Sequence, residues 1–255
     1  MTYYKKLATL FIVLFVASCS KETAGPSTNC RLEKINASNG FIETYSFNEG
    51  GQLIQQIRKG SISTDTSVYT YNASGKIDKI VEAGIALEFL YSSDGKLAST
   101  SEKDAKSLAL KSTVTYFWYA DSVIAVFQNA GAVTPYQIEK THLQGENISK
   151  QTYYEYIGGN LASASTKEYS NYDVGLNPYY VADLKRPGFP NFSSKNNPGK
   201  CVETTIIYSG GVAGSPNIYT VNYTYTYDKN NMTISETDND GSSNQTHYDY
   251  SYSCG

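Results

Sequence analysis

Hydrophobic and polar residues alternate with a period of two through much of the chain. One parity of the segment 219–227 holds Tyr219, Val221, Tyr223, Tyr225 and Tyr227, whereas Asn and Thr occupy the positions between them. Residues 248–254 repeat this alternation with three tyrosines and a cysteine. Because successive side chains of a strand point to opposite faces, the pattern predicts half-buried β-strands. Long stretches of helical periodicity are absent.

A short unit recurs among these strands. It reads aromatic, any residue, aromatic, then Asn or Ser, two residues, Gly, one residue and an aliphatic; copies occupy 45–53, 69–77 and 89–97, with a looser one at 225–231. The two rings share one strand face, the polar residue favours a turn, and Gly takes a positive φ. Each unit therefore predicts a β-hairpin. Residues 30–255 are predicted to form a single all-β domain, an antiparallel meander of about sixteen short strands that is strongly curved or barrel-like.

One long segment, 171–200, interrupts the alternation with four of the seven prolines. Proline lacks the donor that a central ladder needs, so this segment predicts a loop of roughly thirty residues, a length often tied to function. Residues 179–184 could form one helical turn. We favour a cap, in which Tyr179, Tyr180, Phe189 and Phe192 cover the apolar end of the curved sheet. The alternative is that these four aromatic residues form a binding loop.

The first residues indicate a secreted lipoprotein. Two lysines precede an apolar run, 7–16, that is too short to span a bilayer. Val-Ala-Ser-Cys at 16–19 follows, which resembles a lipobox. The sequence thus predicts a signal peptide at 1–18, lipid attached to Cys19, and a flexible tether at 19–29.

This signal predicts a lipid-anchored protein of the outer membrane. Ser-Lys-Glu at 20–22 resembles short acidic signals for surface display, which favours the cell surface over the periplasm. The barrel itself is predicted not to span the membrane. Most strands look shorter than spanning strands, and their non-aromatic face carries Thr, Ser, Asn and Lys.

Three cysteines remain after Cys19, and they allow three pairings. In a meander with an even number of strands, Cys30 and Cys254 lie on the same edge, and they become neighbours if the sheet closes. Cys201 should lie about three strands from Cys254, which is too far for a bridge without strong curvature. We therefore expect a Cys30–Cys254 disulfide, with Cys201 free or buried.

The sequence contains few features that indicate catalysis, metal binding or nucleic-acid binding. It contains 24 acidic and 21 basic side chains, without the basic stripe of a nucleic-acid-binding protein. His142 and His247 stand alone, and neither a metal-ligand cluster nor a nucleophile elbow, phosphate loop or HExxH occurs. Asp238 and Asp240 read as a solvated turn rather than a calcium loop. We predict no catalytic residue, no metal and no cofactor.

The chain resembles a known family. Asn-Pro-Tyr-Tyr at 177–180, Asn-Phe-Ser-Ser-Lys-Asn-Asn-Pro at 191–198, the lipobox, an early cysteine before an amphipathic strand, and the terminal Tyr-Ser-Cys look like a Bacteroidota lipoprotein family of unknown function with a porin-like fold. The hairpin units are also similar to YD repeats of Rhs-type proteins, although those keep Asp after the second Tyr. The resemblance implies a barrel-like sheet and a lipid anchor, and no reaction. Asp-Ser-Val at 121–123 further resembles an O-glycosylation acceptor of Bacteroidota, so Ser122 is a candidate site.

We interpret the protein as a non-enzymatic envelope module whose exposed tyrosines bind a glycan or an envelope protein. The same tyrosines could instead pair across strands and hold the sheet together. One alternative is a hydrolase acting on an envelope polysaccharide, which acids clustered under the 171–200 loop would favour. A groove lined by tyrosines without acids would favour binding. Another alternative, a carrier of apolar ligands, requires an apolar lumen.

Overall fold

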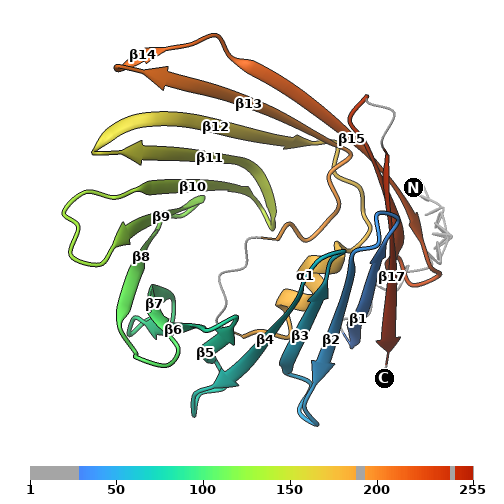
Figure 1. Cartoon of the computed structure of the whole chain (residues 1–255). Coiled ribbons are helices and arrows are strands. Elements are labelled where there is room, and N and C mark those ends of the chain that lie inside the picture. The colour runs from blue at the N-terminus through green and yellow to red at the C-terminus, as the bar shows by residue number, and fades with distance from the viewer. Residues whose placement is uncertain (1–28, 188–192, 242–244, 255) are drawn as a thin grey trace, which may run out of the picture.

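The computed structural model describes residues 29–187, 193–241 and 245–254. Sixteen antiparallel strands close into a barrel, and one further short strand, β14, extends its wall. Figure 1 shows the strands as a ring that surrounds a single short helix. The predicted all-β meander of about sixteen strands is confirmed.

The elements follow one another along the chain as a simple meander. They are β1 (Cys30–Ala37), β2 (Ile42–Phe47), β3 (Leu53–Lys59), β4 (Thr64–Tyr71), β5 (Ile77–Glu82), β6 (Ile85–Tyr91), β7 (Leu97–Asp104), β8 (Leu110–Trp118), β9 (Ser122–Asn129), β10 (Gln137–Gln144), β11 (Asn147–Ile157), β12 (Asn160–Ser170), α1 (Pro178–Asp183), β13 (Lys200–Ser209), β14 (Val212–Ala213), β15 (Asn217–Tyr227), β16 (Thr233–Asn239) and β17 (Thr246–Cys254).

The barrel closes between its first and last strands. β1 pairs antiparallel with β17, with Cys30 opposite Cys254 and Ala37 opposite Tyr248. Cys30 and Cys254 form a disulfide, the pairing expected from the strand parity, and Cys201 is a free, buried cysteine. We call the barrel end that holds Cys30 and Cys254 the terminal rim, and the other end the opposite rim.

The recurring hairpin units all turn at the terminal rim. In the turns that begin with Asn48 and Asn72, the polar side chain accepts a hydrogen bond from a main-chain N–H further along: Gln52 donates to Asn48 Oδ1 at 2.9 Å, and Lys76 donates to Asn72 Oδ1 at 3.0 Å. In the turn of the 89–97 unit, Ser92 Oγ instead donates to the Lys96 carbonyl at 2.9 Å. Gly51 has a φ of 80°, the left-handed conformation that the turn requires. The local interpretation of the unit is therefore correct.

An aromatic residue near the end of a strand also joins neighbouring hairpins, both in two of the units (Tyr71 and Tyr91) and outside them (Trp118 and Tyr252). Its ring N–H or hydroxyl donates to the carbonyl of the residue that begins a strand in the adjacent hairpin: Tyr71 to Leu53 (2.5 Å), Tyr91 to Ile77 (2.7 Å), Trp118 to Leu97 (2.7 Å) and Tyr252 to Thr233 (2.8 Å). These contacts repeat at successive hairpins. They fix each hairpin laterally against its neighbour at the terminal rim.

The proline-rich segment folds into the lumen from the terminal rim. It contains α1, which begins after Asn177, whose side chain accepts from the Tyr179 N–H at 2.9 Å. Beyond the helix, the carbonyl of Lys185 accepts from the Leu53 N–H at 3.0 Å. Proline positions that cannot join the wall thus let the segment run inside it. We call the described part of residues 171–199 the plug.

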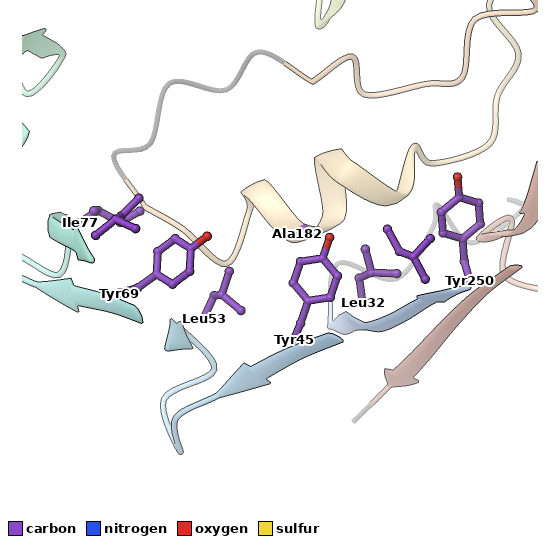
Figure 2. Close-up of a cluster of buried hydrophobic side chains, with 9 residues drawn as sticks. Leu32, Tyr45, Leu53, Tyr69, Ile77, Ala182 and Tyr250 are labelled. Atoms are coloured by element: carbon purple, nitrogen blue, oxygen red, sulfur yellow. The ribbon is translucent and has the colours of Figure 1, made fainter. Parts of the chain in front are cut away.

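The main apolar core lies between the plug and one side of the wall. Leu32, Leu53 and Ile77 are fully buried, and Ala182 of α1 belongs to the same cluster, as Figure 2 shows. The plug therefore covers apolar residues of the wall. Tyr180 and Val181 pack into a second cluster, beside Cys30.

Most of the repeated tyrosines point inward. Tyr45, Tyr69 and Tyr250 are buried in the core, and Tyr71 and Tyr252 pack against it (Figure 2 labels Tyr45, Tyr69 and Tyr250). The expectation that these tyrosines form an exposed binding surface is wrong. Closing the sheet places the aromatic face on the inside, where rings fill the lumen and hydroxyls find partners.

Candidate functional site

A cavity of about 500 Å³ lies under the plug, against the wall formed by β1–β3 and β17. Aromatic rings from Phe41, Tyr45, Tyr179 and Tyr248 line it together with the polar side chains of Glu43, Gln56, Arg58 and Arg186. Asn39 and Phe41, at the β1–β2 turn, place its mouth at the opposite rim. The cavity is therefore a pocket closed by the plug at one end.

A hydrogen-bonded network forms the floor of this pocket. Tyr45 Oη donates to Glu43 Oε1 at 2.7 Å, and Gln56 Nε2 donates to the same carboxylate oxygen. Tyr69 Oη in turn donates to Gln56 Oε1 at 2.5 Å. Burial raises the pKa of Tyr45, and the adjacent Glu43 carboxylate raises it further. The network holds these groups in fixed positions, because each is satisfied by a neighbour on the same or the next strand.

The two arginines of the pocket have acidic partners. Arg58 Nη2 donates to Glu82, whose other carboxylate oxygen accepts from Ser67 Oγ at 2.6 Å. Arg186 forms an ion pair with Asp183, three residues earlier in the plug. Each arginine that lines the pocket is thus paired with the carboxylate of a neighbouring acidic residue.

A pair of carboxyl groups lies on the adjoining wall. Glu236 and Asp238 are two residues apart on β16, and Glu236 pairs with Tyr248, a pocket residue, across the sheet. Glu236 Oε2 accepts from Tyr250 Oη at 2.8 Å. Burial raises the pKa of Glu236 to about 8, the Tyr250 hydrogen bond opposes this, and the Asp238 carboxylate adds to it. Burial also raises the pKa of Asp238. At neutral pH the pair therefore retains a proton.

The position of Asp238 differs from the expectation. It was predicted to lie in a solvated turn, but β16 continues through Asn239, and Asp238 pairs with Tyr223 inside the ladder. Its Oδ1 is buried. The turn begins only at Asp240 and Gly241, because the strand extends as far as its partners β15 and β17 provide a ladder.

The two described aromatic residues of the predicted loop, Tyr179 and Tyr180, lie in different places. Tyr179 lines the pocket and is 40% exposed; burial in the lumen is the main cause that raises its pKa, followed by the Glu43 carboxylate. Tyr180 points elsewhere, donating to Glu146 Oε1 at 3.2 Å at the terminal rim. Phe189, Phe192 and Cys19 lie outside the described residues.

The candidate glycosylation residue Ser122 begins β9 and is only 6% exposed. Its hydroxyl donates to Asp121 Oδ1 at 3.2 Å. Modification of Ser122 stays a prediction.

The pocket residues Glu43, Gln56 and Arg58 were not singled out from the sequence. Each alternates with outward-facing residues on β2 or β3, which is the signal that could have placed them on the inner face. Across the sheet, Glu43 pairs with Arg58 and Tyr45 with Gln56. Acids therefore do gather under the 171–200 segment, together with tyrosines.

Two absences hold for the described part of the chain. No three His, Cys, Asp or Glu side chains among these residues are grouped so that they could hold a metal ion. Nor does any helix within the described ranges have the length and apolar character needed to cross a membrane.

Comparison with known proteins identifies the fold. No family model matches the chain, and no curated protein matches it either. A porin-like protein from Bacteroides uniformis ATCC 8492 superposes with a TM-score of 0.53 at 12% identity, covering 88% of this chain and 95% of that one. A porin-like protein from Bacteroides vulgatus ATCC 8482 gives 0.49 at 11% identity, covering 88% and 98%. The chain thus has a porin-like β-barrel fold, with its lumen plugged by its own segment. Membership of a lipoprotein family and kinship with YD repeats stay predictions.

Proposed function

We propose that this protein is a lipid-anchored envelope protein that binds a glycan in the pocket under the plug. The pocket is the observation that carries the proposal. Its volume of about 500 Å³ falls in the range of small-ligand sites, roughly 300–1,000 Å³. Aromatic rings suit the flat apolar faces of sugars, and the fixed amide, carboxylate and guanidinium groups suit their hydroxyls. Since both arginines are ion-paired and the Glu43 carboxylate already accepts from Tyr45 and Gln56, the expected ligand is neutral.

The envelope location rests on the lipobox at Cys19 and on the porin-like fold of the Bacteroides neighbour. Exposed ion pairs on the wall, such as Lys150 with Glu168, support a barrel that does not span the bilayer, since lipid-facing walls are apolar. Metabolic labelling with a palmitate analogue should mark the wild type, and label that persists in Cys19→Ala would contradict the anchor. Protease shaving of intact cells distinguishes surface from periplasmic display.

Binding is tested with the Cys19→Ala protein lacking residues 1–18 on an array of neutral and acidic envelope polysaccharides. Tyr179→Ala should weaken binding of a neutral glycan at least about tenfold, because it removes a ring that lines the pocket. Tyr119→Ala is the matched control, since Tyr119 is an exposed tyrosine in the β8–β9 turn outside the pocket. The proposal fails if no glycan binds, or if the two variants bind equally well.

A polysaccharide hydrolase is a second candidate, favoured by the Glu236–Asp238 pair beside the pocket. A carboxyl group with a pKa of about 8 is protonated at neutral pH and could act as a general acid toward a glycosidic oxygen. Glu236→Gln should then abolish release of reducing ends while glycan binding persists. The polar pocket floor disfavours the carrier of apolar ligands.

A further inference from the structure

Five hairpins of the opposite rim each present a strongly exposed aliphatic side chain. Ile62 is 97% exposed between β3 and β4, Leu108 58% between β7 and β8, Val133 93% between β9 and β10, Ile157 75% at the end of β11, and Val212 72% in β14. Because consecutive antiparallel strands turn at alternate ends, all five lie on the same rim of the closed barrel. These residues are called the rim tips below.

Charge is distributed unequally between the two rims. The turns 60–63, 130–134, 158–159 and 209–214, which carry or adjoin four rim tips, consist of Gly, Ser, Ala, Thr, Ile and Val and contain no charged residue. Turns of the terminal rim contain Asp94 and Lys96, Glu146, and Asp228 and Lys229. An apolar side chain on an uncharged turn can leave water without desolvating a charge. Among the described residues, the opposite rim carries charge at Lys106, in the turn of Leu108, and at Asp240, so both features are combined in the turns of the other four tips.

A tyrosine lies close in sequence to two of the rim tips, and another lies on the strand paired with a third. Tyr136 follows Val133 by three residues, Tyr156 immediately precedes Ile157, and Tyr208 lies opposite Ala213, the neighbour of Val212. Tyrosine is enriched where a protein meets the headgroup region of a bilayer, because its ring is apolar and its hydroxyl can remain hydrated.

We propose that the opposite rim docks on a lipid bilayer, with the rim tips inserted at the boundary between headgroups and acyl chains. The tips come from separate hairpins around the barrel, so they do not form one continuous face. A stable protein partner needs about 800 Å² of complementary surface on each side, whereas a fluid bilayer accepts each tip separately. Four tips on uncharged turns and an acidic chain of net charge −3 favour a zwitterionic surface.

The length of the N-terminal segment is compatible with this orientation. Cys30 lies at the terminal rim, so a lipid on Cys19 must reach past the barrel wall to enter the same bilayer. Residues 19–29 span at most about 38 Å at roughly 3.5 Å per residue. Strands of eight to eleven residues, tilted by about 40°, give a wall about 20–30 Å high. The tether is therefore long enough for both contacts.

Vesicle flotation tests the proposal with the Cys19→Ala protein lacking residues 1–18, which removes any contribution from lipidation. The barrel from Cys30 to Cys254 is complete in this protein. It should float with phosphatidylcholine vesicles equally in 0.1 M and 1 M NaCl. The triple variant Ile62→Ser, Val133→Ser, Ile157→Ser should reduce the vesicle-bound fraction at least about tenfold. The triple variant replaces no residue that lines the pocket. Because the pocket opens at the same rim, glycan binding is measured without vesicles, so that failure of either proposal can be told from failure of the other.

The matched control replaces two exposed aliphatic residues away from the opposite rim. Leu90 is 63% exposed near the end of β6, and Val174 is 74% exposed at the entry of the plug. The double variant Leu90→Ser, Val174→Ser should bind vesicles as the wild type does. In addition, Val133→Trp should shift its emission to the blue and be quenched by brominated acyl chains, while Leu90→Trp should show neither effect.

Four outcomes would overturn the proposal. They are a wild-type protein that does not float, a triple serine variant that floats as well as the wild type, binding that is lost in 1 M NaCl, and concentration-dependent self-association without vesicles that the triple variant abolishes. The last result would identify the rim as a contact between two copies of the chain. Circular dichroism of each variant ensures that a loss of binding does not reflect unfolding.

Discussion

Replacing Glu236 by glutamine tests whether the lumen retains a proton at neutral pH. The substitution keeps the shape of the side chain and removes its ionisation. The amide oxygen can still accept from Tyr250 Oη, and the amide N–H₂ can donate toward Asp238 in place of the shared proton. The variant should therefore fold like the wild type.

The magnitude follows from the pKa of Glu236, which rises from 4.5 in the reference state to about 8 in the fold. Below pH 4.5 both the folded and the unfolded chain hold the proton, and the contribution to stability is fully present. Between pH 4.5 and 8 the unfolded chain releases the proton while the folded chain keeps it, so the free energy of unfolding falls as the pH rises. At 1.36 kcal/mol per pKa unit, the wild type should lose about 3 kcal/mol between pH 5 and pH 8 that the variant does not lose.

Urea unfolding at pH 5, 6, 7 and 8, with the disulfide intact, measures this difference. The stability of Glu236→Gln relative to the wild type should increase steadily across the series. Glu168→Gln is the control, because Glu168 is exposed on the outer wall and pairs there with Lys150. Stability curves of wild type and Glu236→Gln that stay parallel from pH 5 to pH 8 would refute the reasoning.

Three further predictions concern the wall and the plug. In Gly175→Ala the new Cβ would lie 2.2 Å from a ring carbon of Tyr227, so we expect a loss of about 1–3 kcal/mol in thermal unfolding, and a wild-type melting temperature would contradict this. Cys254→Ser removes a crosslink that spans 224 residues and should cost up to about 5 kcal/mol in urea unfolding. Non-reducing peptide mapping of the wild type should show Cys30 joined to Cys254, and a crosslinked peptide containing the third cysteine would disprove that pairing. Tyr91→Phe loses a 2.7 Å hydrogen bond to the adjacent hairpin and should destabilise the barrel by about 1 kcal/mol, whereas an unchanged unfolding midpoint would show that this contact contributes nothing.

The sequence by itself determined the strands and their turns. Alternation around Tyr225 and the Asn48 and Asn72 turns depend only on residues a few positions apart, through the period of a strand and the φ preference of glycine. The number of strands then placed Cys30 and Cys254 on one edge. Since every step of this argument is local or a matter of parity, it did not require the tertiary structure.

Only the tertiary structure decided what the barrel encloses. Closure turned the tyrosine face inward, and register set Glu43 opposite Arg58, while the plug brought Arg186 against them from far along the chain. The same register kept Asp238 within the wall, where local composition predicts a solvated turn. These contacts depend on strand pairing and closure across the whole chain. No short window of sequence specifies these contacts, because the free energy that stabilises them comes from burying surfaces far apart in sequence.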